Sequence, residues 1–473
     1  MSDRILRLWT SWTIGRARRD HLRRGTPDWR PGEPLRLLFA GYNGARNTGS
    51  DMRVHEMLRQ VRQVLGAGNL RLAVLTQNRD LTAGYFGDAA QIDLPDVFPP
   101  FLGREVPRHH GVVACEGSMF KSRFAEALTT MMIGALGVAA ARNRLALGYG
   151  AEAGAMSPPL ERMVRRHCAT TPILVRNEES AQVLQRLRVP VLPGTDTAWT
   201  FVPHPPEVGG RLLAEHGWNG ETPVLAVCPI NPFWWPVRAS LTKAVARRLG
   251  GARRHRHYRS LYFHRSGRDV DSAFGAYLSA VAQAVDSFRA RQRVFPVVVG
   301  MERLDREACE RLAELLGGAP VLTSDEHDMF DLVSVLRHAA LLVSSRYHAI
   351  VATLPALVPS AGVTMDERIR NLMTDSRREH LLLAVDDPDL AERLGGVLET
   401  LIGSRTEGRR ATADIVAGHL RLMARMGHSL EAAVGERFPQ FPVRRGLVGW
   451  REYLPPLDPV LERLVGHHTD PIE

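Results

Sequence analysis

An arginine and a histidine two residues apart, Arg346 and His348, are the residues of this sequence best suited to chemistry. The apolar run 341–343 leads into Ser344-Ser345-Arg346-Tyr347-His348, and a second apolar run, 349–352, follows at once. This order predicts a buried strand that ends where a helix begins, the place where ligands of open α/β sheets bind. A guanidinium can hold a carboxylate or phosphate through two hydrogen bonds, and an imidazole can move a proton near neutral pH. We therefore expect this pair to be catalytic and to act on a small anion.

Two glycine-containing segments follow other strand-like runs and supply candidate substrate-binding residues. In the loop 41–51 we assign this role to Gly44, Asn47 and Asp51, because backbone amides at a helix N-terminus bind anions. In the segment 115–122 we assign it to Ser118 and Lys121. A tight turn with Asp51 as a helix cap, and a helix start with a solvent-facing lysine, are the alternative interpretations.

A proline-rich loop at residues 228–238 carries two tryptophans and further candidates. Asn231, Trp234 and Arg238 are assigned to substrate binding, since the apolar face of a sugar stacks well on an aromatic ring. The alternative is that the tryptophans pack at a domain interface, and for one of the two this interpretation is preferred.

The remaining candidates are charged residues that follow strand-like runs. Arg176 follows the run 173–175, where it supports the next loop or faces the substrate. Asp366 and Arg368 lie beyond the apolar run 356–359 and are assigned to the acceptor.

The length and the cysteines limit the architecture and the compartment. A chain of 473 residues exceeds one ordinary core, which predicts two main domains. The four cysteines are far apart and form no Cys-x-x-Cys pair, which argues against a disulfide framework or a zinc site. We expect no metal and no cofactor, and a cytoplasmic setting.

The basic residues gather in two regions, 4–24 and 243–268, within a net charge of +10. Such regions attract phosphates, acidic glycans, anionic membranes or nucleic acid, or they form a solvated surface. Trp9 and Trp12 in the first region predict a short basic helix that rests on the inner face of the membrane or packs on the protein itself. Apart from Tyr258, Tyr262 and Phe263, the basic runs lack the interleaved aromatics of nucleic-acid surfaces, which argues against nucleic acid as a partner.

Alternating strand-like and helix-like segments predict two doubly wound, Rossmann-like α/β domains that face a cleft. The expected boundaries are a basic N-terminal extension (1–34), a first domain (35–205), a second domain (206–400) and a helical C-terminal extension (401–473) that packs back on the body. The expected linker is the proline-rich stretch 203–210. Strands are predicted at 35–40, 71–76, 111–115, 145–149, 173–175, 224–228, 294–299, 321–322 and 341–344.

Taken together in this order, the motifs resemble the polysaccharide pyruvyl transferase family. The resemblance covers most of residues 41–372. It rests on a glycine-rich loop, a Gly-Ser turn, an Arg-x-Glu-x-Ser-like segment with a later Pro-Asp step, and an Arg-x-His turn, carried by Gly41, Tyr42, Gly44, Asn47, Gly49, Asp51, Gly117-Ser118, Arg176, Glu178, Ser180, the segment 193–198, Arg346, His348, Ala349 and Pro355.

The family implies a two-domain, GT-B-like glycosyltransferase fold and transfer of a pyruvyl ketal from phosphoenolpyruvate onto two hydroxyls of a glycan or lipid-linked glycan precursor. Carried over, Arg346 binds the donor and His348 acts as general acid. Two departures stand out: Cys115-Glu116-Gly117-Ser118 replaces a turn that often holds Asp, and Pro229-Ile230-Asn231 stands where many members have Arg. A nucleotide-sugar glycosyltransferase and a non-catalytic anion-binding protein of a polysaccharide locus are the alternatives. The oligomeric state, the acceptor sugar and the second donor-binding cation stay open.

Overall fold

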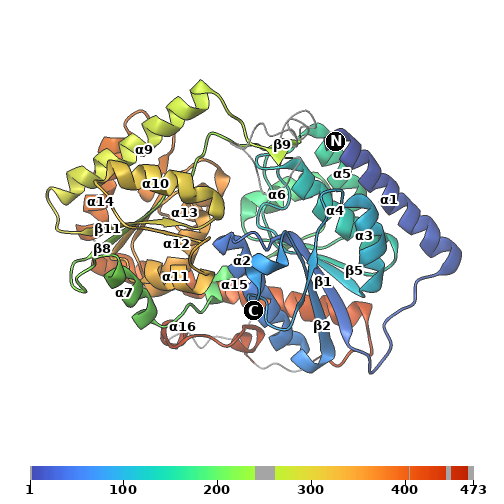
Figure 1. The fold of residues 1–473 in the computed structure, drawn as a ribbon. Helices are drawn as coiled ribbons and strands as arrows, with labels where there is room; N and C mark the ends of the chain where they lie inside the picture. The colour runs from blue at the N-terminus through green and yellow to red at the C-terminus, as the bar shows by residue number, and fades with distance from the viewer. Residues whose placement is uncertain (1–2, 240–261, 404, 444–448, 467–473) are drawn as a thin grey trace.

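The computed structural model describes residues 3–239, 262–403, 405–443 and 449–466, which form two α/β domains side by side (Figure 1). The first domain has a parallel sheet in the order β3-β2-β1-β4-β5-β6-β7. Its strands are β1 (Leu35–Asn43), β2 (Leu70–Thr76), β3 (Ala90–Asp93), β4 (Gly111–Ala114), β5 (Leu145–Ala151), β6 (Ile173–Val175) and β7 (Val191–Pro193). Its helices are α1 (Asp3–Arg24), α2 (Thr48–Leu65), α3 (Pro99–Glu105), α4 (Glu126–Ala141), α5 (Pro158–His167) and α6 (Glu178–Arg186).

The second domain repeats this architecture with a parallel sheet in the order β12-β11-β8-β13-β14-β15. Its strands are β8 (Val224–Cys228), β11 (Phe295–Gly300), β12 (Val321–Thr323), β13 (Leu341–Ser344), β14 (Ser360–Thr364) and β15 (Leu382–Ala384). Its helices are α7 (Pro206–Glu215), α9 (Arg268–Arg289), α10 (Arg306–Leu315), α11 (Met329–Arg337), α12 (Tyr347–Thr353), α13 (Glu367–Asp375) and α14 (Leu390–Gly403). A two-stranded antiparallel ribbon pairs β9 (Arg238–Ala239) with β10 (Tyr262–Phe263).

Parallel strands covered by helices on both faces are apolar throughout, which explains the continuous apolar runs of the sequence. Strands β4, β5, β8 and β13 are buried along their whole length. Helix α4 is likewise buried on nearly all sides, as its apolar sequence indicates. In the ranges described, no helix has both the length and the apolar character that crossing a bilayer requires.

The predicted fold class is confirmed, and each predicted strand is present. Six short strands, β3, β7, β9, β10, β14 and β15, were not predicted, because two to five residues carry too little periodicity to be recognised. The apolar run 356–359 lies just before β14 rather than in a strand.

The expected linker at 203–210 needs a correction, because helix α7 begins at Pro206 and belongs to the second domain. Its Gly209 packs so closely on α11 that a methyl group there would lie 2.6 Å from the Ser334 backbone. The close approach of α7 to α11 explains why residue 209 is glycine, which the sequence alone suggested was part of a linker.

The C-terminal segment returns to the first domain, as predicted. Helix α15 (Arg405–Arg437) contacts α2, β5 and β7, and the short helix α16 (Pro459–Val465) follows it. The Gln60 amide of α2 donates to the carbonyls of Met423 (2.7 Å) and Tyr453 (2.9 Å). The segment therefore fastens the helix that carries the glycine-rich loop.

Candidate active site

The strand end with Arg346 and His348 opens into a cleft between the two domains. Strand β13 ends at Ser344 and α12 begins at Tyr347, so the predicted strand-to-helix turn is present. The cleft has a volume of about 110 Å³. The first domain contributes Tyr42, Asn47, Gly49, Ser50, Glu116, Ser118, Phe124, Ala125 and Leu128, and the second contributes Trp235, Met301, Glu302, Arg346, Tyr347, His348, Met365 and Arg368.

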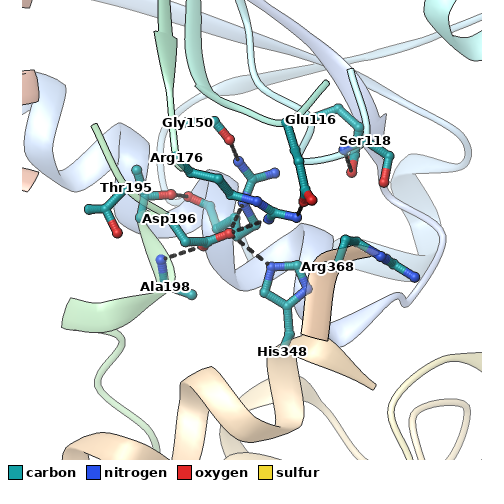
Figure 2. Close-up of polar contacts among 12 residues, drawn as sticks. Glu116, Ser118, Gly150, Arg176, Thr195, Asp196, Ala198, His348 and Arg368 are labelled. Atoms are coloured by element: carbon teal, nitrogen blue, oxygen red, sulfur yellow. Dashed lines mark hydrogen bonds and ion pairs between the residues drawn. The ribbon is translucent and has the colours of Figure 1, made fainter. Parts of the chain in front are cut away.

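The His348 imidazole reaches across the cleft to a carboxylate of the first domain (Figure 2). Its Nε2 lies 3.2 Å from the Oδ2 atom of Asp196. The same oxygen pairs with Arg53 Nε (2.9 Å) and accepts a hydrogen bond from Arg176 (2.9 Å), while Oδ1 accepts one from the Ala198 amide (2.9 Å). Both oxygens are therefore engaged, which fixes the carboxylate in place.

Burial decides the protonation of His348, and the surrounding charges decide that of Asp196. Burial alone would raise the pKa of the Asp196 carboxyl, but Arg53, His348 and Arg176 together hold it far below its usual range. Burial lowers the pKa of His348 to about 4, against the opposing effect of Asp196. The imidazole is therefore neutral near pH 7. Because an ionised carboxylate only accepts, the single ring proton lies on Nε2, and Nδ1 carries a lone pair.

The other ring nitrogen of His348, Nδ1, points to the start of α2. A methyl group at Gly49 would lie 2.2 Å from His348 Nδ1, so only glycine leaves room for the ring. Asn47 caps the same helix by accepting a hydrogen bond from the Ser50 amide (3.1 Å). The glycine-rich loop thus brings a helix N-terminus up to the nitrogen that can exchange a proton.

Arg346 lines the cleft, but its guanidinium is bound to acidic residues of its own domain. Its Nε donates to Asp305 (2.9 Å), and Nη2 contacts Asp305 and lies 2.7 Å from Glu302. The Tyr42 hydroxyl of the first domain donates to Glu302 (3.2 Å). This is a correction to the expected role: the guanidinium joins the loop after β11 to the site and does not lie open to an anion.

Arg368 is a second cation at the cleft. Its Nε donates to Asp366 (2.8 Å), and its guanidinium lies over the Phe124 ring, 4.4 Å from the ring centre. Within the described part of the chain, its two terminal nitrogens donate no hydrogen bond. Arg368 and His348 both line the cleft, so these nitrogens are available to an anionic ligand there.

The first-domain wall of the cleft presents a carboxylate and two hydroxyls. Glu116 accepts a hydrogen bond from the Ser50 hydroxyl (3.3 Å) and one from the Ser118 amide (3.3 Å). Ser118 therefore lies where it was predicted. Glu116, which replaces the aspartate of the resembled family, keeps a carboxylate in this turn.

A charged network crosses the domain interface behind this wall. The Lys121 ammonium lies 3.2 Å from both Glu152 and Glu367, and burial lowers its pKa to about 8, although Asp366 and Glu367 oppose the shift. Arg176 contacts Glu152 and covers the Tyr347 ring at 4.3 Å. Lys121 and Arg176, both predicted as substrate-binding, instead hold the two domains together.

Other predicted residues support the backbone. Gly44 has a φ of +76°, and its amide donates to Asp51 (2.8 Å), whose carboxylate is buried under the loop. Burial raises the pKa of Asp51 to about 7. Asn231 accepts from the Phe233 amide (3.1 Å), and Asp366 caps α13 by accepting from the Arg368 amide (3.0 Å).

The tryptophan loop is arranged differently from the prediction. Trp234 stacks on His264, with ring centres 4.4 Å apart, and does not line the cleft. Trp235 lines it and packs edge-on against Phe124 of the first domain at 5.2 Å. The Arg238 side chain and residues 240–261, which include most of the basic region 243–268, lie outside the described residues.

The central carboxylate, Asp196, was not among the residues predicted from the sequence. Asp196 belongs to the segment 193–198, which was matched only to a family Pro-Asp step. Its partner Arg53 lies inside a helix pattern that resembles any amphipathic helix, and nothing local marks it as buried. The only sequence signal was a polar Thr-Asp-Thr cluster after a short strand.

One group of possible metal ligands lies away from the cleft: His204, Asp328 and Asp331. Asp331 pairs with His204 (2.9 Å), and Asp328 caps α11 by accepting from the Phe330 and Asp331 amides (both 2.8 Å). These contacts account for the cluster without an ion.

No family model matches the sequence, and neither does any curated protein. Solved structures share the architecture at low identity. A protein of Listeria monocytogenes described as a UDP-N-acetylglucosamine 2-epimerase has 11% identity and a TM-score of 0.52, over 84% of this chain and 97% of its own. The UDP-GlcNAc 2-epimerase of Neisseria meningitidis, bound to UDP-GlcNAc, has 10% identity and a TM-score of 0.50, over 80% of this chain and 94% of its own. S. aureus MnaA with UDP has 8% identity and a TM-score of 0.51, over 84% of this chain and 96% of its own. The chain therefore has the two-domain, GT-B-like fold of these proteins.

Proposed function

We propose that the protein is a pyruvyl transferase, which moves a pyruvyl group from phosphoenolpyruvate onto two hydroxyls of a glycan or glycan precursor. One observation carries this proposal: the cleft brings together the free guanidinium nitrogens of Arg368 and the neutral, carboxylate-anchored imidazole of His348. An anionic donor and a proton transfer are the two requirements of this reaction.

The chemistry divides between these two side chains. The bond between the enol carbon and the bridging oxygen of the phosphate breaks. Two C–O bonds form between that carbon and the oxygens of the two acceptor hydroxyls. One hydroxyl proton ends on the methylene carbon, which becomes a methyl group, and the other leaves with phosphate. Arg368 holds the carboxylate or phosphate of the donor through paired charge-assisted hydrogen bonds.

His348 is the proton carrier in this scheme. Its Nδ1 first takes a proton from an acceptor hydroxyl, because the imidazole is neutral in the free protein. The imidazolium formed lies beside Asp196, which stabilises it, and it then returns the proton to the donor as a general acid. The general-acid role expected from the resemblance thus becomes the second half of a base-then-acid cycle.

The first-domain wall suits a polyhydroxylated acceptor. Glu116 and Asn47 can accept hydrogen bonds from sugar hydroxyls, and Ser118 can donate or accept one. Trp235 offers an aromatic edge at the same cleft. The proposed acceptor is therefore a sugar with two neighbouring hydroxyls, free or at the end of a lipid-linked glycan.

The competing function is an enzyme that uses a nucleotide-sugar. Two solved proteins of the same fold were determined with UDP-GlcNAc or UDP bound, which makes this the alternative that an experiment has to separate. A donor at a hundred- to thousandfold excess over its Kd raises the free energy of unfolding by about 3–4 kcal/mol.

The test compares phosphoenolpyruvate with UDP-GlcNAc on the full chain. We expect phosphoenolpyruvate alone to stabilise the protein, and phosphate to be released when a panel of oligosaccharides with paired hydroxyls is added. His348→Ala should bind the donor without releasing phosphate, whereas Arg368→Ala should lose donor binding. Stabilisation by UDP-GlcNAc alone would overturn the proposal, and donor binding without turnover on any acceptor would favour an anion-binding protein.

A further inference from the structure

The outer face of α1 carries an unusual group of exposed apolar side chains. Among the described residues, seven large apolar side chains are exposed, and four of them lie on this helix: Ile5 (51%), Leu8 (62%), Trp12 (54%) and Leu22 (74%). The first three follow at spacings of three and four residues, so they share one stripe of the helix. The opposite stripe packs on α3 and α4 through Leu6, Thr10, Thr13, Ile14 and Ala17.

Arginines surround this apolar stripe. Helices α1 and α5 together contain ten arginines and three acidic residues. Between the two helices runs a groove lined by Arg4, Arg7, Leu8, Ser11, Pro159, Arg162, Met163, Arg165, Arg166 and His167. Of the acidic residues, Asp20 is already paired with Arg142 (3.4 Å), so the face stays strongly basic.

We propose that the α1–α5 face, defined as the outer stripe of α1 with the basic groove beside it, docks on a lipid bilayer that contains anionic lipids. Apolar side chains and a tryptophan enter the headgroup region, while arginines around them contact lipid phosphates. Charge alone would also suit nucleic acid, but exposed aliphatic side chains gain nothing from a phosphate backbone in water. The combination favours a membrane.

The position of this face relates it to the cleft. Arg7 of α1 pairs with Glu126, the first residue of α4, and Ala125 and Leu128 beside it line the cleft. Figure 1 shows α1 along the outer edge of the first domain. Docking would therefore hold the cleft close to the bilayer, within reach of a lipid-linked acceptor. This last consequence rests on the proposed function, whereas the docking itself does not.

The experiment is co-flotation of the full chain with vesicles, without donor or acceptor. One set of vesicles is phosphatidylcholine alone, and the other contains phosphatidylglycerol as well. We expect binding only to the second set, weakened by salt. Because each arginine near an anionic surface contributes about fivefold in affinity, the triple variant Arg162→Ala/Arg165→Ala/Arg166→Ala should bind about a hundredfold more weakly.

Two further variants test whether binding requires the apolar side chains of this face and the position of its arginines, rather than net charge alone. Leu8→Glu/Trp12→Glu removes the apolar anchor, and both side chains are exposed, so folding should be preserved as judged by circular dichroism. Arg370→Ala/Arg409→Ala/Arg410→Ala removes the same charge from exposed sites elsewhere and should bind normally. Equal binding by all variants, no binding to either vesicle, or retention of RNA with the same dependence on these residues would overturn the proposal.

Discussion

Replacing Asp196 by asparagine tests the centre of the site, because this change removes one charge and almost no volume. The carboxylate is buried and interacts with Arg53, Arg176 and His348 at 2.9, 2.9 and 3.2 Å. Asparagine can still accept from the Ala198 amide. It leaves two buried guanidinium groups with less negative charge beside them and no longer requires the His348 proton to lie on Nε2.

The structure gives the size of both effects. Removing one partner of a buried ion pair costs about 3–5 kcal/mol, and here Arg176 keeps Glu152 while Arg53 keeps the carbonyls of Cys115 and Gly150, which favours the lower end. The catalytic effect is larger. In serine proteases the Asp-to-Asn change on a catalytic histidine lowers kcat about 10⁴-fold because the tautomer is wrong, and we expect a loss of about 10³- to 10⁴-fold here.

The assay measures phosphate release and urea unfolding for Asp196→Asn and for a matched control, Asp458→Asn. Asp458 pairs with Arg337 (3.2 Å), is half-buried and caps α16, but it does not contact the cleft. Both variants should lose stability, and only Asp196→Asn should lose turnover. Normal turnover in Asp196→Asn, or an equal loss in the control, would refute the assignment of Asp196 to His348.

Three further predictions follow from the same geometry. Arg368→Ala should raise the Kd of phosphoenolpyruvate about 10- to 100-fold, measured by calorimetry, with partial recovery in Arg368→Lys. Gly49→Ala should lower kcat about a hundredfold by displacing the His348 ring, whereas Gly435→Ala, where a methyl group meets nothing within 4 Å, should not. Because folding lowers the pKa of His348 from 6.5 to about 4, the unfolded chain takes up a proton first as pH falls. Stability to urea should therefore decrease from pH 6.5 towards pH 4, and less so in His348→Gln.

Elements with strong periodicity or abrupt turns could be predicted from the sequence alone. The apolar run before Ser344 and the polar residues after it predicted both the strand and the turn that delivers His348 to the cleft. The same reasoning overestimated Arg346, because a motif gives the position of a guanidinium but not its partners. Its partners, Glu302 and Asp305, follow a different strand, and no local pattern connects them to residue 346.

Asp196 shows that contacts between residues far apart in the sequence cannot be predicted from local patterns. It lies 152 positions from His348, on the other domain, and the two meet only because β7 and β13 both end at the cleft. Local spacing cannot report such a meeting. The prediction for Lys121 was wrong for a related reason. A lysine after a strand is expected to contact solvent or substrate, whereas Lys121 is buried between carboxylates of both domains.

The division of the site between two domains has a chemical consequence. The carboxylate that directs the His348 proton belongs to the first domain, and the imidazole belongs to the second. The glycine-rich loop is held on the second domain by the Thr48 amide, which donates to the Met301 carbonyl (2.8 Å), and by Tyr42 through Glu302. If the domains separate, His348 loses both Asp196 and the burial that lowers its pKa, and Nδ1 loses its place against Gly49. Contact between the two domains therefore fixes the proton of His348 on Nε2 and holds Nδ1 against Gly49, so the proton carrier is complete only when the domains are together.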